Sequence, residues 1–205
     1  MAARTNGLSE LTRFWLTERH GCLVRESVPV PVPYNLSDID FVAMNPANKK
    51  FTLPDRVTEV GPRLIVESKD EHDWEPVGTD FALKFHNDQL KFDKEKHYVP
   101  AKTRGVCFSM LRQEHYDIAT NVFNTQEFDR VFVVHAVDPS GFEGMVEFYR
   151  EQRVFWVTAQ ELLDDLRKWY KEPKRRSGLR NTLMGDLFHL LFGYLRVDER
   201  REEGK

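Results

Sequence analysis

Apolar residues recur with a helical period at the start of the chain, and short apolar runs of strand type follow. The first pattern predicts an amphipathic helix over residues 7–20. Strands are predicted near 22–30, 38–44 and 63–69, while the prolines and glycine of 45–62 indicate a loop or a long hairpin. The apolar arc of the predicted helix is formed by Leu8, Leu11, Phe14, Trp15 and Leu16.

The second half of the chain alternates predicted helices and strands. A helix is predicted over about 106–123, and strands are predicted over 130–137 and 153–158. Thr158 and Glu161 fit a capping box, which predicts that another helix begins there. Alternation of this kind predicts an α/β fold, with a mixed central β-sheet flanked by helices.

A last helix is predicted over 179–195, and its apolar residues surround most of the helix instead of forming one stripe. Such a helix either lies in the core or buries a second face against another subunit.

The composition indicates one domain. With 205 residues and 40% hydrophobic content, the chain can form one well-filled core, and no segment marks a linker. We expect a single domain over 1–205, with a core at 7–170 and a polar loop or flap at 70–104. Cys22 and Cys107 lie far apart and imply neither a disulfide framework nor a zinc site. The apolar runs are too short to cross a membrane and no signal peptide is evident, so a soluble, cytoplasmic protein is expected.

Acidic residues lie on two of the predicted strands. Asp38 and Asp40 share one face of the first, and Glu67 and Lys69 share one face of the second, because successive strand residues point to opposite sides. If the strands pair, three carboxylates and an ammonium group converge. Clustered carboxylates repel one another, and a divalent cation such as Mg²⁺ or Mn²⁺ removes that cost. The lysine can then orient an attacking water or offset charge in the transition state.

Alternatives remain for some of these acids. Asp40 directly precedes an apolar run and is preferred as a ligand, whereas Asp38 is either a helper for a second metal or an Asx-type turn residue. Glu10 falls at the margin of the apolar arc of the first helix, from which a side chain can face a cleft. Two further Glu-x-Lys triplets, at 172–174 and 203–205, do not follow a strand-like run and are not candidates.

An aspartate on one strand and Glu-x-Lys on the next resemble the PD-(D/E)XK superfamily of restriction-endonuclease-like nucleases. The spacing from Glu10 to Gly21 is similar to that of its Holliday-junction-resolvase branch, whereas Ile39 replaces the proline that commonly precedes the aspartate. The resemblance covers residues 7–75 well and 125–170 loosely.

The resemblance implies a restriction-endonuclease-like fold and a Mg²⁺-dependent endonuclease, in which Mn²⁺ can substitute, and it favours a homodimer. It implies that Asp40, Glu67 and the backbone carbonyl of Ser68 bind the metal, that Lys69 positions the attacking water, and that Glu10 supports a second ion.

Basic residues cluster near the end of the chain, and no acidic residue interrupts them. Such a cluster can contact nucleic-acid phosphates, although the net charge of −3 does not by itself indicate nucleic-acid binding. Branched or damaged DNA is the preferred substrate, with RNA and a defence role such as restriction as alternatives. A non-catalytic nucleic-acid-binding or assembly subunit that keeps the fold is the competing hypothesis. The predicted phosphate contacts are Lys174, Arg175, Arg176 and Arg180, and Lys49 and Lys50 could also contact phosphate.

Overall fold

The structure is a computed structural model, and it describes residues 7–31, 36–69, 113–134, 150–151, 153–179 and 182–202. Its contacts divide the chain into two compact units, Met1–Glu161 and Leu162–Lys205. The single nuclease domain expected from the sequence stays a prediction, and the expected flap at 70–104 lies outside the described residues.

The first unit contains a five-stranded sheet in the order β1-β2-β5-β6-β7, and a small hairpin, β3-β4. The pairs β1-β2 and β2-β5 are antiparallel, whereas β5-β6 and β6-β7 are parallel, so the sheet is mixed. Its elements are α1 (Gly7–Phe14), the π-helical turn η1 (Trp15–Arg19), β1 (Leu23–Pro31), β2 (Leu36–Met44), β3 (Phe51–Thr52), β4 (Glu59–Val60), β5 (Arg63–Lys69), α4 (Gln113–Phe123), β6 (Asp129–Val134) and β7 (Val154–Thr158).

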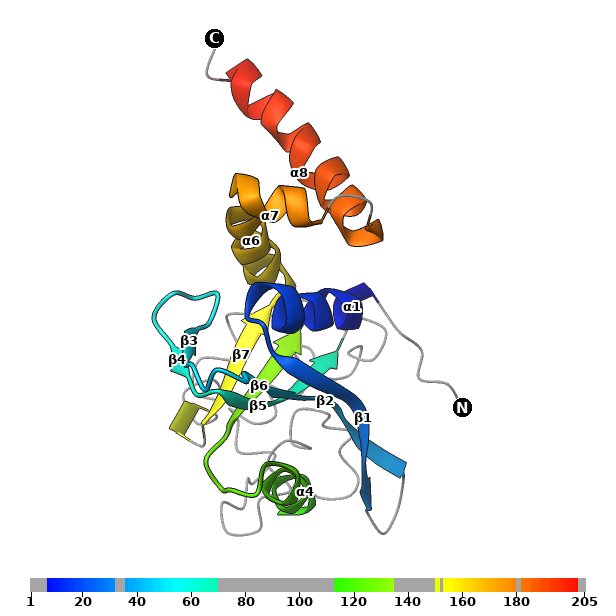
Figure 1. Ribbon diagram of the computed structural model, residues 1–205, viewed down its shortest axis with the longest axis vertical. Helices are drawn as coiled ribbons and strands as arrows, with labels where there is room; N and C mark the ends of the chain where they lie inside the picture. The colour runs from blue at the N-terminus through cyan, green and yellow to red at the C-terminus, as the bar shows by residue number, and fades with distance from the viewer. Residues whose placement is uncertain are drawn as a thin grey trace, which may run out of the picture. The chain divides into compact units, whose positions relative to one another are not determined.

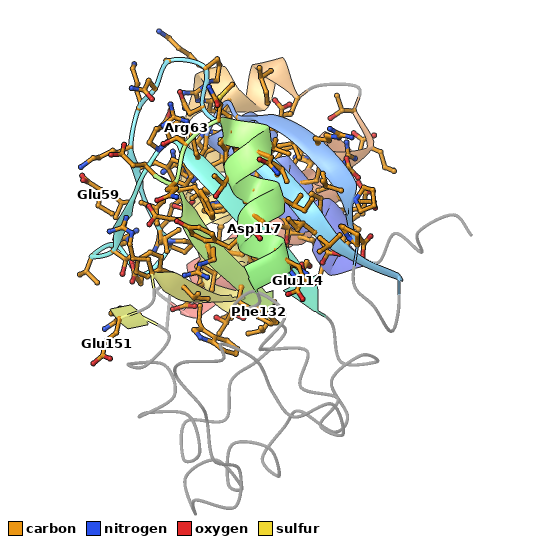
Figure 2. All side chains as sticks on the ribbon, turned by 90° about the horizontal axis from the view of Figure 1, so that it is seen from below. Glu59, Arg63, Glu114, Asp117, Phe132 and Glu151 are labelled. Atoms are coloured by element: carbon orange, nitrogen blue, oxygen red, sulfur yellow. The ribbon has the colours of Figure 1, made fainter. Side chains whose placement is uncertain are left out.

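Helices cover both faces of this sheet. Figure 1 shows α1 and α4 on opposite sides of the strands, and Figure 2, turned by 90°, shows α4 with its labelled Glu114 and Asp117 crossing in front of them. Helix α1 contacts β5 and β6, and α4 contacts β1. The predicted α/β fold with a mixed central sheet flanked by helices is therefore confirmed.

Burial along the strands explains the order of the sheet. Residues 64–66 of β5 and 131–134 of β6 are buried on both faces, as expected for central strands that pair in parallel beneath two layers of helix. Strand β1 instead lies at the edge, where Pro29 and Pro31 cost no ladder hydrogen bond with a further strand.

The predicted loop at 45–62 contains the β3-β4 hairpin, which Leu53 and Val60 anchor as buried residues. Asp55 holds its tip, because the carboxylate accepts hydrogen bonds from the backbone N–H groups of Val57 and Thr58 at 3.0 and 2.9 Å. Burial opposes the charge on Asp55, but the hydrogen bonds from Thr58 and Val57 and the charge of Arg150 outweigh it, and the pKa of Asp55 is lowered.

The buried carboxylate of Asp129 connects the segments that lead into the central strands. Asp129, at the start of β6, is 1% exposed and accepts a hydrogen bond from the backbone N–H of Gly61 at 2.6 Å. Its other oxygen pairs with Arg153, which precedes β7. Because the parallel register places Asp129 beside Leu64, this contact lies at the end of β5 away from Lys69.

Helix α6 (Ala159–Tyr170) begins where the capping box predicts. The backbone N–H of Thr158 donates to Glu161 Oε2 at 2.8 Å, and the N–H of Glu161 donates to Thr158 Oγ1 at 3.2 Å. This reciprocal pair satisfies two N–H groups that the first turn of a helix leaves without intrahelical acceptors.

The second unit continues with α7 (Pro173–Gly178) and α8 (Leu183–Glu202). The last helix predicted over about 179–195 is therefore present, but it begins at Leu183 and extends to Glu202. The chain leaves α7 at Leu179, and α8 starts after Thr182, whose Oγ1 accepts a hydrogen bond from the N–H of Gly185 at 3.0 Å. Gly185 is required at this corner, since a Cβ there would lie 2.1 Å from the carbonyl oxygen of Leu179.

Aromatic packing holds α8 within its own unit. Tyr170 contacts Phe188 edge to face, with ring centroids 5.7 Å apart, and Phe188 stacks on Phe192 at 5.1 Å. In the described part of the chain, no helix combines the length and the apolar character needed to cross a membrane.

Candidate active site

The two acidic strands lie side by side at the centre of the sheet. Antiparallel pairs run from Met44 opposite Arg63 to Phe41 opposite Val66. The ladder ends at that pair, and the next residue along each strand is Asp40 on β2 and Glu67 on β5. The condition that the sequence analysis set for the carboxylates to converge, that these two strands pair, is therefore met.

Hydrogen bonds connect Asp40 and Glu67 to each other's strand. The backbone N–H of Ser68 donates to Asp40 Oδ2 at 2.7 Å, and the backbone N–H of Asp40 is 3.4 Å from Glu67 Oε2. The first is a short, charge-assisted bond, and the second is long and weak. Glu67 is only 4% exposed, and Asp40 is half-buried. Two carboxylates thus lie close together with little water around them, a setting that favours a bound cation.

Aromatic side chains continue the row of Asp40 and Glu67 across the sheet. The parallel register places Phe132 beside Glu67, and Trp156 beside Phe132. The two rings pack with centroids 4.9 Å apart, and Phe132 is fully buried. An apolar wall on one side of Glu67 lowers the local dielectric and strengthens any charge interaction made by its carboxylate.

Ser68 and Lys69 extend β5 beyond Glu67. The backbone of Lys69 pairs with Val134, and strand alternation places Lys69 on the same face as Glu67; its side chain is not among the described parts of the chain. Ser68 is 2% exposed, and its side-chain oxygen has no hydrogen-bond partner among the described residues. The roles of the Ser68 carbonyl and of Lys69 stay predictions.

Glu10 lies on α1 and is engaged by another residue of that helix. Its Oε2 forms an ion pair with Arg13, whose Nε also lies 3.8 Å from Glu26 Oε1 of β1. The hydrogen bond to Glu10 is the main cause that raises the pKa of Arg13 above its usual value. The carboxylate of Glu10 is therefore already paired with a positively charged side chain of the protein, the guanidinium of Arg13.

Asp38 lies within β2, where it pairs with Pro29, so its interpretation as a turn residue is wrong. It shares a face with Asp40 by strand alternation. Across the described residues, His, Cys, Asp and Glu side chains form no group of three or more that could hold a metal. The structure thus brings Asp40 and Glu67 together, but does not join Glu10 or Asp38 to them in such a group.

The basic residues predicted to contact phosphate belong mainly to the second unit. Lys174 and Arg175 are exposed on α7, where the guanidinium of Arg175 lies 5.6 Å from the ring centroid of Trp169 and 3.5 Å from Glu172 Oε2. The side chain of Arg176 and the whole of Arg180 lie outside the described residues.

Lys49 and Lys50 precede the β3-β4 hairpin, and Lys50 Nζ forms an ion pair with Glu59 at 3.0 Å. This hairpin connects to β2 at Met44 and to β5 at Arg63, the ends of the two strands away from Asp40 and Glu67. These lysines therefore do not flank the carboxylate pair.

Cys22 does not supply a nucleophile at neutral pH. It is free and buried, and burial raises the pKa of its thiol to about 11. A thiol with that pKa carries almost no thiolate, which is the reactive form.

Sequence reasoning missed the partner of Glu10 and the backbone conformation of Ser27. Arg13 pairs with Glu10 at a spacing of three, a spacing at which oppositely charged helix residues commonly meet, so a signal existed. Ser27 of β1 has a φ of +49°, and nothing in its residue type predicts that conformation, which glycine and asparagine favour. None of the protein-family models, curated proteins and solved structures compared with this chain matches it, so the function must be inferred from its own residues.

Proposed function

We propose that this protein is a Mg²⁺-dependent endonuclease that hydrolyses phosphodiester bonds in DNA, and that it is a nuclease of the PD-(D/E)XK kind. One observation supports the proposal above all others. Asp40 and Glu67 lie on neighbouring strands, where Asp40 accepts a hydrogen bond from the backbone N–H of Ser68 and Glu67 accepts one from that of Asp40, and strand alternation places Lys69 on the same face as Glu67.

The donor set of this site suits a hard cation. Asp40 and Glu67 supply carboxylate oxygens, and the backbone carbonyl of Ser68 is a third candidate oxygen on the same strand pair. A bound Mg²⁺ would polarise a phosphate oxygen and lower the pKa of a bound water. Two or three protein ligands are enough for Mg²⁺, because this ion keeps several bound waters and also binds substrate phosphate oxygens.

The chain's own residues have separable roles in this proposal. Asp40 and Glu67 bind and orient the cation, and Lys69 holds the attacking water and offsets negative charge that develops on the phosphate. Phe132 and Trp156 limit the access of water on the β6 side of Glu67. Glu10 would have to leave Arg13 before it could support a second ion.

DNA is the proposed substrate, with branched or damaged DNA preferred and RNA the alternative that an activity assay separates. Lys174 and Arg175 are exposed on α7 and supply positive charge for the phosphate backbone. Such contacts position a substrate without reading its sequence.

A homodimer is part of the proposal. Four leucines of α8 are exposed, while Phe188 on the same helix is buried. Leu183, Leu187 and Leu190 follow the spacing of four and three residues that forms the seam of a coiled coil, so a second copy of α8 would complement this stripe. The exposed leucines are Leu183, Leu187, Leu190 and Leu191.

A non-catalytic nucleic-acid-binding subunit is the second candidate. Two observations favour this candidate. Arg13 forms an ion pair with Glu10, and the described His, Cys, Asp and Glu side chains form no group of three that could hold a metal. A protein that keeps this fold only for binding would need no further carboxylate near Asp40 and Glu67.

The test is cleavage of a labelled panel with Mg²⁺, Mn²⁺ or EDTA. The panel contains supercoiled plasmid, linear duplex, single-stranded DNA, a four-way junction and RNA. Glu67→Ala is compared with Glu59→Ala, which changes an exposed glutamate of the β3-β4 hairpin. Metal-dependent cutting that only Glu67→Ala abolishes would support the nuclease. Binding of the panel without cutting by the wild type would favour the non-catalytic subunit.

A further inference from the structure

The antiparallel pairing of β1 with β2 is interrupted once, which divides the ladder into two stretches. The first runs from Leu23 opposite Met44 to Glu26 opposite Phe41, and the second begins at Val28 opposite Ile39. The same register holds in both, so Ser27 and Asp40 face each other at the junction between them.

Ser27 has an unusual backbone for this place. Its φ of +49° is left-handed, and for a residue with a Cβ this conformation costs roughly 1–2 kcal/mol. Ser27 is exposed, so burial of its side chain does not explain the strain. Among the described residues, the other non-glycine residues with positive φ all lie outside the strands, in turns or loops: Asn48, Arg56, Asn124 and Arg153.

The orientation of Asp40 supplies a reason for the strain. A side chain in a regularly paired strand stands roughly perpendicular to the sheet. Asp40 Oδ2 instead accepts a hydrogen bond from the backbone N–H of Ser68 at 2.7 Å, which requires the carboxylate to turn toward the neighbouring strand β5. Interrupting the β1-β2 pairing beside Asp40 gives its backbone the freedom to make that turn.

We infer that Ser27 is a positioning residue, whose left-handed backbone directs the Asp40 carboxylate toward β5 and Glu67. The inference rests on the proposed function only in that Asp40 is taken as a cation ligand; the geometric role can be tested without any activity. Backbone strain of this kind persists where the surrounding structure imposes it, commonly beside functional groups.

Ser27→Gly and Ser27→Val separate the backbone from the side chain. Glycine adopts positive φ without steric cost, whereas valine strongly resists it and favours continuous pairing of β1. Ser27→Thr keeps the hydroxyl and adds the β-branch that resists positive φ, so it serves if Ser27→Val does not fold. Arg25→Val is the matched control, because Arg25 is exposed on the same strand and faces Val42.

Two readouts are needed. The first is hydrogen exchange of the Ser68 amide followed by NMR, and the second is the Mg²⁺ concentration for half-maximal cleavage. We expect Ser27→Val, or Ser27→Thr in its place, to lower the protection of the Ser68 amide at least 10-fold and to raise the Mg²⁺ requirement at least 10-fold, with the KM for DNA unchanged. Ser27→Gly and Arg25→Val should match the wild type in both.

Two outcomes would overturn the inference. One is wild-type protection of the Ser68 amide in a folded Ser27→Val protein, and the other is a Ser27→Gly protein that behaves like Ser27→Val, since the hydroxyl would then be what matters. If the wild type itself cleaves nothing, the nuclease proposal fails, while the amide measurement still decides the role of Ser27.

Discussion

Asp40 and Glu67 each accept a hydrogen bond from the backbone of the other's strand, Asp40 from Ser68 at 2.7 Å and Glu67 from Asp40 at 3.4 Å. The arrangement holds two carboxylates together in a place where Glu67 is 4% exposed. Mutual repulsion and lost hydration then act against the folded state, and a bound cation relieves both. Metal binding should therefore raise the free energy of unfolding of the protein.

We expect Mg²⁺ or Mn²⁺ at ten times its Kd to stabilise the wild type by about 1.4 kcal/mol. For a chain of this size that corresponds to a rise in Tm of roughly 3–5 °C. Glu67→Gln should abolish the rise, and without metal it should be at least as stable as the wild type, because one buried charge is removed. Thermal melts with and without metal measure this. A full metal-dependent rise in Glu67→Gln would remove Glu67 from the ligand set.

Lys69→Ala should lower kcat by about 100-fold or more, because a group that positions the nucleophile and offsets transition-state charge contributes on this scale. DNA binding and Tm should stay close to wild type. Single-turnover cleavage together with fluorescence anisotropy separates the chemical step from binding. Lys50→Ala is the control, since Lys50 pairs with Glu59 on the hairpin. Equal losses in both variants would mean that general electrostatics, and not Lys69, drive the effect.

Local sequence patterns predicted the sheet well. The strands around Asp40 and Glu67 were placed correctly because alternation and apolar runs depend only on which side chains must be buried. The start of α6 followed from Thr158 and Glu161, whose reciprocal hydrogen bonds are a local interaction. The convergence of Asp40 and Glu67 required only that the two strands be neighbours.

Features set by contacts between elements were predicted less well. Leu179 lies four residues before Leu183, a helical spacing, so periodicity alone did not reveal the corner between α7 and α8. Gly178 and Thr182 were available as end and start signals, since glycine ends helices and threonine caps them. The left-handed backbone of Ser27 had no comparable signal, because serine, unlike glycine and asparagine, does not favour positive φ.

Gly185→Ala should destabilise the second unit by roughly 1–3 kcal/mol, because the new Cβ must displace the backbone of Leu179. Gly178→Ala is the matched control. A Cβ at Gly178 meets no heavy atom within 4 Å in the described structure, and alanine in a helix is favoured over glycine by up to about 1 kcal/mol. Urea denaturation followed by circular dichroism measures both. Equal midpoints for the two variants would contradict the close approach of Leu179.

The β3-β4 hairpin should weaken in acid. The pKa of Asp55 is lowered in the folded state, so its contribution is fully present above the unfolded value near 3.8 and is lost as the pH falls through the folded value. Hydrogen exchange of the Thr58 and Val57 amides, which bond to Asp55, should therefore accelerate below about pH 4 after correction for intrinsic rates. Asp55→Asn should remove this pH dependence. An unchanged pH profile in Asp55→Asn would show that another group is responsible.

The leucine stripe of α8 should control the oligomeric state. Leu187 and Leu190 are 41% and 57% exposed and lie three residues apart, so a double change to glutamate places two charges in the proposed seam without touching the buried Phe188. We expect the wild type to be a dimer by light scattering and the Leu187→Glu, Leu190→Glu protein to be a monomer with an unchanged circular dichroism spectrum. Val57→Glu changes an equally apolar residue that is 82% exposed on the hairpin, and it should leave the dimer intact. A wild type that is monomeric at all concentrations tested would exclude the second copy as the partner of this stripe. A dimer that survives the double change would place the interface elsewhere, because two buried, uncompensated carboxylates at a coiled-coil seam cost several kcal/mol.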